Sequence, residues 1–144
     1  MTETLDDGAA HYFHVRAIDS SGRWSDDFET YGPMRIDTVA PEKPASVTCQ
    51  YTGSSGVWPF MTWHYEFDCA DVTDTTSGVK QYDLQYRYEY AYVWCDPILA
   101  TNTARPRQFD YTADTLVHPQ VEVRFRVIDW AENSSGWSVW VRCD

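Results

Sequence analysis

Apolar and polar residues alternate most clearly between positions 121 and 129, where the sequence reads VEVRFRVID. A period of two is typical of a β-strand with one buried and one exposed face. The polar turn NSSG at 133–136 follows, and residues 137–142 form a second extended run. This pattern predicts two successive strands joined by a turn.

The same pattern occurs near the start of the chain. HYFHVRAID at 11–19 aligns with VEVRFRVID at 121–129 without a gap, and SSGRWS at 20–25 is similar to SSGWS at 134–138. A unit of 110 residues therefore recurs, and the chain contains less than two copies of it.

Shorter alternating runs predict the remaining strands. Two of them, at 11–18 and 34–37, precede the stretch DTVAPEKP at 37–44, which is typical of a linker because its prolines stiffen the chain and exclude helix. Seven more are expected, at 47–51, 61–67, 81–88, 91–95, 108–112, 121–127 and 137–142. Seven short strands within about 100 residues are typical of an immunoglobulin-like β-sandwich.

Composition favours the same fold class. The 144 residues are 43% hydrophobic and 16% aromatic, and aromatic side chains suit strands. No long stretch has helical spacing, so an all-β fold is expected. The net charge of -11 argues against nucleic acid or an anionic membrane surface as the partner.

No apolar run approaches the length that spans a membrane, so membrane insertion is not expected. Residues 1–7, MTETLDD, have neither the basic nor the apolar part of a signal peptide. Export would then be encoded upstream, or the sequence is that of the mature chain.

All four cysteines lie in the second part of the chain: Cys49, Cys69, Cys95 and Cys143. Their spacings contain no CxxC and no Cys/His cluster, which argues against a zinc site. An even number within one β-rich region favours two disulfides and an oxidising compartment.

Five segments resemble fibronectin type III modules, of the kind found in tandem in large bacterial surface and secreted proteins. They are HVRAIDSSGRWS (14–25), its second copy FRVIDWAENSSGWS (125–138), IDTVAPEKP (36–44), FMTWHYE (60–66) and SGVKQYDLQY (77–86). The resemblance implies a complete seven-stranded sandwich in residues 39–144. Residues 1–38 would be the last strands of an incomplete second sandwich, and the Tyr-rich segment 88–107 departs from the family pattern.

The family topology also implies a cysteine pairing. The first and last strands of such a sandwich run parallel, which would bring Cys49 and Cys143 to the same end. Cys69 and Cys95 would both lie at the opposite end. The expected disulfides are therefore Cys49–Cys143 and Cys69–Cys95.

The segment WSVW at 137–140 resembles the Trp-Ser-x-Trp-Ser box of cytokine-receptor fibronectin modules, with Val141 in place of the final serine. In that box, arginines of a neighbouring strand stack between tryptophans. The resemblance implies a Trp/Arg ladder on one sheet face, made of Arg87, Arg124, Arg126, Trp137 and Trp140. Each cation-π contact stabilises by about 0.5–2 kcal/mol, and a stabilising role is favoured over a binding role.

Five other aromatic residues are candidates for a binding platform: Trp58, Tyr90, Tyr92, Trp94 and Trp130. Exposed aromatic faces suit sugar rings or a protein partner. The favoured alternative is that these side chains fill the core or the junction between domains.

Two acidic clusters could supply carboxylate oxygens to calcium, DDFE at 26–29 and the group Asp68, Asp71 and Asp74. Neither follows an EF-hand spacing, so solvated loop charge is favoured, and no metal or cofactor is expected.

Catalytic motifs are also missing. His11, His14, His64 and His118 form no HExxH pair, and the sequence has no GxSxG, phosphate-binding loop or paired glycosidase motif. His64 is expected to be a surface histidine, and the chain is not expected to be an enzyme.

Together these expectations describe a non-enzymatic, extracellular or cell-surface module with a structural, spacing or adhesive role. The apolar face of the incomplete copy must be covered, either by another copy of the chain, giving a dimer or filament, or by further sequence of a longer polypeptide. The expected partner is therefore protein. The alternative is a carbohydrate-binding accessory module of a secreted enzyme.

Overall fold

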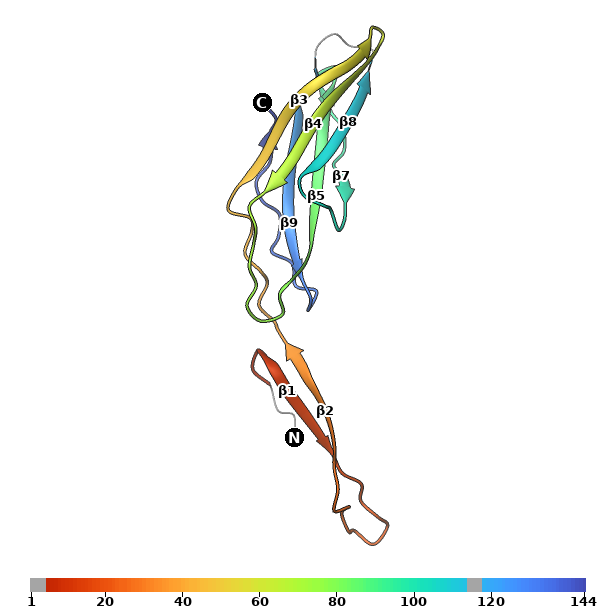
Figure 1. The fold of residues 1–144 in the computed structure, drawn as a ribbon, viewed down its shortest axis with the longest axis vertical. Coiled ribbons are helices and arrows are strands. Elements are labelled where there is room, and N and C mark those ends of the chain that lie inside the picture. The colour runs from red at the N-terminus through yellow and green to blue at the C-terminus, as the bar shows by residue number, and fades with distance from the viewer. Residues whose placement is uncertain (1–4, 114–117) are drawn as a thin grey trace.

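The structure, a computed structural model, describes residues 5–113 and 118–144, and the described residues contain strands but no helix. The strands are β1 (Gly8–Val15), β2 (Glu29–Ile36), β3 (Val47–Val57), β4 (Phe60–Cys69), β5 (Val79–Tyr90), β6 (Val93–Trp94), β7 (Ile98–Ala100), β8 (Arg107–Ala113), β9 (Val121–Asp129) and β10 (Val141–Arg142). The molecule is elongated, with the β1–β2 hairpin at one end and the other strands packed together at the other (Figure 1). The expected all-β fold is confirmed.

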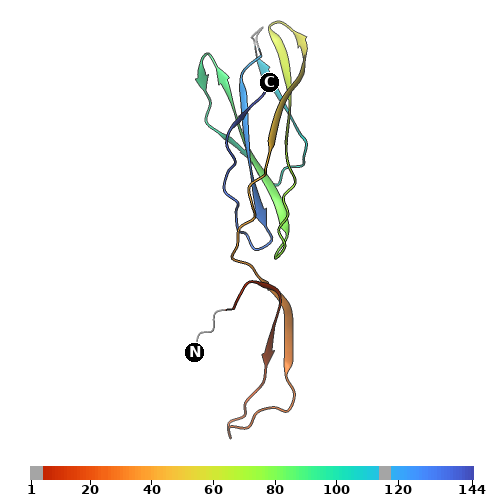
Figure 2. The ribbon, with the colours of Figure 1, turned by 90° about the vertical axis from the view of Figure 1, so that its left-hand side faces the viewer.

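The strands after the linker form two antiparallel sheets, which Figure 2 shows from the side. One sheet has the order β3-β4-β8, and the other has the order β10-β9-β5 with β6 and β7 paired to β5. Side chains from both sheets contribute to one core, an arrangement consistent with a β-sandwich.

The predicted alternation decides which side chains enter this core. β9 buries Val121, Val123, Phe125 and Val127, and β4 buries Trp63, Tyr65 and Phe67. Aromatic rings also meet across the space between the sheets. The ring centres of Tyr86 in β5 and Phe109 in β8 are 4.4 Å apart.

The bounds of several strands differ from the prediction. β3 continues through TGSSG to Val57, with a bulge between Tyr51 and Gly53, because β4 provides pairing partners along its whole length. The strand expected at 91–95 is reduced to Val93–Trp94, while Ile98–Ala100 in the following irregular stretch pairs with β5. β2 begins at Glu29, inside the expected loop.

The repeat seen in the sequence is also a repeat of local hydrogen bonding. The Ser25 N–H donates to the Ala17 carbonyl at 2.8 Å, and the Ser25 hydroxyl accepts from the Ala17 N–H at 3.1 Å. Ser135 and Val127, 110 positions later, make the same two bonds at 3.0 and 2.9 Å. Ser25 therefore corresponds to Ser135. The similarity of SSGRWS to SSGWS would have matched Ser25 with Ser138 instead.

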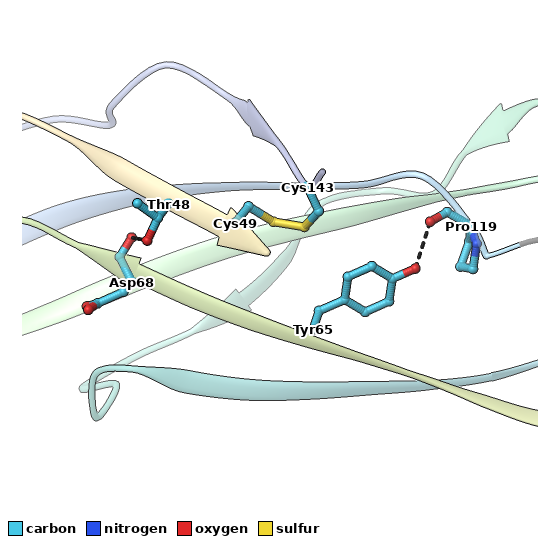
Figure 3. The surroundings of a disulfide bond; sticks show 6 residues. All are labelled: Thr48, Cys49, Tyr65, Asp68, Pro119 and Cys143. Atoms are coloured by element: carbon cyan, nitrogen blue, oxygen red, sulfur yellow. Dashed lines mark hydrogen bonds between the residues drawn. A yellow bond between two sulfur atoms is a disulfide. The ribbon is translucent and has the colours of Figure 1, made fainter. Parts of the chain in front are cut away.

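The disulfide Cys49–Cys143 is confirmed (Figure 3). It joins β3 to the residue that follows β10, across a separation of 94 residues. Closing a loop of this length stabilises the fold by about 4.7 kcal/mol in the chain-entropy model. Near this bond the buried Tyr65 hydroxyl donates to the Pro119 carbonyl at 2.8 Å.

The second expected disulfide does not form, because Cys69 and Cys95 are free thiols at different ends of β5. Cys69 contacts Arg105, whose guanidinium lies 3.8 Å from the ring centre of Tyr82. Cys95 instead donates its N–H to the Tyr88 carbonyl. Six residues of strand span about 20 Å, and a disulfide needs Cα atoms within about 7 Å. The hairpin at β6 is too short to carry Cys95 back along the sheet.

We expect exactly two thiols per chain to react with iodoacetamide after unfolding without reductant, and peptide mapping should find both adducts on Cys69 and Cys95. In the folded protein Cys95 should react before Cys69, because burial raises the pKa of the Cys69 thiol to about 11 and little thiolate forms. Unmodified Cys69 and Cys95 in the unfolded chain would show that the two are bonded after all.

Candidate functional site

Arginine and tryptophan side chains alternate in a stack on the outer face of the β10-β9-β5 sheet. The distances from guanidinium carbon to ring centre are 4.8 Å for Arg126–Trp137, 5.1 Å for Arg124–Trp137, 4.5 Å for Arg124–Trp140, 4.5 Å for Arg87–Trp140, 4.9 Å for Arg87–Trp94 and 5.8 Å for Arg142–Trp94. The structure thus brings together all five residues of the expected Trp/Arg ladder. It extends the ladder with Arg142 and with Trp94, which had been considered for the binding platform.

Serine hydroxyls position the segment that carries two of these tryptophans. The Ser138 N–H donates to the Phe125 carbonyl at 2.8 Å, and the Phe125 N–H donates back to the Ser138 hydroxyl at 3.0 Å. Ser135 pairs with Val127 in the same way. Side-chain hydroxyls therefore replace strand carbonyls along this edge, and the regular pairing of β10 is limited to two residues.

Each ladder arginine that lies on β9 or β5 also donates to a polar acceptor on the other of these two strands. Arg126 donates to the Asp83 carboxylate at 2.9 Å, Arg124 to the Gln85 amide oxygen at 2.6 Å, and Arg87 to the Glu122 carboxylate at 2.7 Å. Asp83 is fully buried, so its pairing with Arg126 offsets a large desolvation penalty. Burial, together with the positive charge of Arg87, lowers the pKa of Arg124. The tryptophan rings and arginine charges of the ladder thus interact with each other and with neighbouring strands. This favours a stabilising role over a binding role.

The other candidate aromatics are exposed but divide between the two ends of the sandwich. Trp58 lies in the β3–β4 turn, and Tyr90 and Tyr92 lie at the β5–β6 turn, where Tyr92 is 96% exposed. Trp130 follows β9 at the other end of the sheet, with the Lys80 ammonium 5.8 Å from its ring centre. β5 has 12 residues and so spans about 40 Å. The five residues therefore do not form one platform.

A shallow groove of about 390 Å³ lies beside the β5–β6 turn. It is lined by Tyr88, Tyr90, Val93, Trp94, Cys95 and Tyr111. Its walls are mainly aromatic, as in sites that bind sugars or apolar peptide side chains. This groove contains two of the expected binding aromatics, Tyr90 and Trp94.

The carboxylates of the two predicted acidic clusters lie in different surroundings. Asp26 and Asp27 of the DDFE segment lie in the loop between β1 and β2, Glu29 begins β2, and all three residues are exposed. Asp68 and Asp71 form ion pairs with Arg105, the former at 3.7 Å. Asp74 makes no such pair among the described residues and instead meets Asp37 and Asp129.

Sequence reasoning missed a Ser-His-Asp group on the outer face of the β3-β4-β8 sheet. The Ser55 hydroxyl lies 2.9 Å from His64 Nε2, and His64 Nδ1 lies 2.7 Å from the Asp110 carboxylate. His64 is directly opposite both Asp110 and Gly53 in the strand register. Because Gly53 has no side chain, the imidazole can reach Ser55 two residues further along β3. The pairing of β3, β4 and β8 was the missing signal.

This group has the order of a catalytic triad but not its surroundings. Catalysis by a serine nucleophile also needs oxyanion donors and exclusion of water. The side chains of His64 and Asp110 are 31% and 61% exposed, so solvent reaches the group from the sheet face. We interpret it as a cross-strand hydrogen-bond chain.

Replacing Trp140 by Ala should lower the free energy of unfolding by about 2–4 kcal/mol, because the ring contacts both Arg87 and Arg124. Urea denaturation followed by tryptophan fluorescence measures the change. Trp130→Ala is the matched control, since this exposed ring has a single, longer cation contact, and its effect should stay below about 1 kcal/mol. Equal losses in the two variants would remove the ladder as a stabilising feature.

We expect the protein and its Ser55→Ala variant to hydrolyse p-nitrophenyl acetate at the same rate. The reason is the open position of the Ser55–His64–Asp110 group, where bulk water competes with any substrate. A rate that falls tenfold or more in Ser55→Ala, while Ser54→Ala keeps the original rate, would instead establish catalysis.

None of the described residues forms a helix that is long and apolar enough to cross a membrane. Comparison of the chain with protein-family models and with curated proteins finds no match. The function must therefore be inferred from the structure itself.

Proposed function

We propose that the chain is a non-catalytic structural or adhesive module of an extracellular assembly, built as a fibronectin type III-like sandwich of seven strands. The strand orders β3-β4-β8 and β10-β9-β5 with β6 support this assignment, and the short β7, which also pairs with β5, is an additional strand. The first strand of the sandwich, β3, and the C-terminal segment are also joined by the Cys49–Cys143 disulfide. A disulfide of this kind persists in oxidising compartments, which supports a location outside the cell or on its surface.

The observation that carries the proposal is the bare β1–β2 hairpin. It repeats the hydrogen bonding of the β9 turn at an offset of 110 residues, yet no second sheet formed by the described residues covers it. Its exposed large apolar side chains are Tyr12, Phe13, Val15, Ile18, Trp24, Phe28, Tyr31 and Met34. A two-stranded sheet of this composition needs cover in water. Residues 1–38 are thus the last strands of a sandwich whose remaining strands come from elsewhere.

Two sources can supply the missing strands, and both make the chain part of a larger assembly. Preceding residues of a longer polypeptide would give a tandem array of sandwiches. Another copy of this chain would add strands to the free edges of β1 and β2 and give a dimer or a filament. The elongated arrangement of hairpin and sandwich suits either kind of linear assembly (Figure 2).

A carbohydrate-binding accessory module is the second candidate, and the groove beside the β5–β6 turn favours it. Tyr90 is exposed at this groove and is available to stack on a sugar ring. Saturable heat on titration with soluble glycans, lost in Tyr90→Ala, would support this candidate over the structural role.

If another copy covers the hairpin, light scattering after size-exclusion chromatography should give at least twice the chain mass of 16.7 kDa, rising with concentration. Phe13→Asp should return the protein to the monomer, because it places a charge on the face to be covered. Val139→Asp is the control, since Val139 is exposed on the sandwich and outside the hairpin.

A monomer at all concentrations would contradict completion by a second copy. Hydrogen exchange then tests the broader proposal. Rapid exchange of the β1 and β2 amides in that monomer would support completion by a longer polypeptide, whereas strong protection would show that the hairpin is stable alone and would overturn the incomplete sandwich.

A further inference from the structure

Three aspartates from distant parts of the sequence meet where the linker joins the sandwich. Asp37 directly follows β2, Asp74 lies between β4 and β5, and Asp129 ends β9. One carboxylate oxygen of each lies within 4.8 Å of the other two. Asp129 is fully buried and Asp37 nearly so. Three negative charges are therefore close together with little water around two of them.

Hydrogen bonds orient these carboxylates but do not neutralise them. Asp74 accepts the N–H groups of Thr76, Ser77 and Gly78, Asp37 accepts those of Val39 and Ser77, and Asp129 accepts the backbone and amide N–H groups of Asn133. No described Lys or Arg forms an ion pair with any of the three; Arg35, which is close by, donates to the Ser77 carbonyl. Each carboxylate oxygen can accept more than one partner, so capacity for a cation remains.

The Ser77 hydroxyl is a second, independent sign of a missing ligand. Ser77 is 1% exposed, and its oxygen has no hydrogen-bond partner within hydrogen-bond geometry among the described residues. The Ser77 N–H donates to the Asp37 carboxylate at 3.1 Å, which places this residue beside the cluster. A buried hydroxyl without a partner destabilises the fold by about 1–3 kcal/mol, and a bound cation would give this oxygen a partner.

The first copy of the repeat shows how the same position is neutralised there. Asp19 is equivalent to Asp129, and both accept bonds within the same turn. In the first copy Arg23 donates its Nε to the Asp19 carboxylate at 3.3 Å. The residue equivalent to Arg23 is Asn133, whose amide donates to Asp129 at 2.9 Å but carries no charge. The second copy therefore lacks the positive charge that the first copy contains.

The donor set determines which cation fits. All the available atoms are oxygens, from three carboxylates and one hydroxyl, which favours a hard cation over zinc. Oxygens that bind one Ca²⁺ at about 2.4 Å lie within about 4.8 Å of one another, as these carboxylates do. A groove of about 460 Å³, whose lining includes Asp37 and Asp74, opens these two aspartates to solvent and gives an entry path.

We propose that Asp37, Asp74, Asp129 and the Ser77 hydroxyl form a calcium site at the junction of linker and sandwich. The ion links the end of β2, the β4–β5 loop and the end of β9. It thereby fixes the direction in which the β1–β2 hairpin leaves the sandwich. This site does not depend on what covers the hairpin, so it stands or falls separately from the proposed function.

Isothermal titration of the chelator-treated 144-residue protein with CaCl2 tests the site. We expect one ion per chain with a Kd of about 10⁻⁴–10⁻³ M, as in extracellular calcium modules, and a higher Tm in calcium than in EDTA. Asp74→Asn should weaken binding at least tenfold, because the amide keeps an oxygen for the three N–H groups but loses the charge. Asp71→Asn, in the same loop and paired with Arg105, is the matched control and should bind normally.

Two further variants separate metal binding from folding. Ser77→Ala should raise the Tm in EDTA, since it removes a buried hydroxyl that has no hydrogen-bond partner, and should reduce the further rise in Tm with calcium. Asn133→Arg should raise the Tm in EDTA and abolish the response to calcium, because it restores the charge present in the first copy. Absence of saturation below about 10 mM calcium, or equal losses in Asp74→Asn and Asp71→Asn, would overturn the site.

Discussion

A β-sheet with an apolar face is stable in water only when something covers that face, and this chain contains the same strand both with and without cover. Phe125 in β9 and Val15 in β1 occupy equivalent positions of the repeat, 110 residues apart. Phe125 is 0% exposed and Val15 is 57% exposed. Full burial of such a side chain stabilises the fold by about 1.5–3 kcal/mol. The sandwich gains this hydrophobic free energy and the hairpin does not. The difference lies in the surroundings of the strand and not in its own sequence.

When the two sheets enclose the core they also bury polar groups, and each buried polar group needs a hydrogen-bond partner. The chain meets it mainly across neighbouring strands. Asp83, fully buried, accepts from Arg126 on β9, and the Ser135 and Ser138 hydroxyls complete the hydrogen bonds of an edge that has little regular pairing. The tryptophans then cover the outer side of the arginines. Charge, hydrogen bond and ring stacking thus act on the same few residues, which makes this sheet face a stabilising structure.

The sequence was sufficient for features that depend on local periodicity. Burial in β9 and β4 followed from alternation, and residues 37–46, which contain the prolines, form no strand. Features that depend on which strands pair were harder to predict. Cys95 was expected at the wrong end of the sandwich because nothing in the Tyr-rich segment shows that β6 stops after two residues. The cluster of Asp37, Asp74 and Asp129 was missed for the same reason, since its members are brought together only by three separate turns at one end of the fold.

The junction between hairpin and sandwich depends on few direct contacts. Arg35 donates to the Ser77 carbonyl, the Ser77 N–H donates to Asp37, and Asn133 donates to the Asp37 carbonyl. The neutral bond from Asn133 stabilises by about 1 kcal/mol, and the other two are stronger because each involves a charged group, the Arg35 guanidinium or the Asp37 carboxylate. All three contacts converge on Asp37 or on its neighbour in space, Ser77. A cation bound at this point would act on the same residues that transmit orientation from the sandwich to the hairpin. In a linear assembly the stiffness of each joint would then follow the calcium concentration, without any change in the strands themselves.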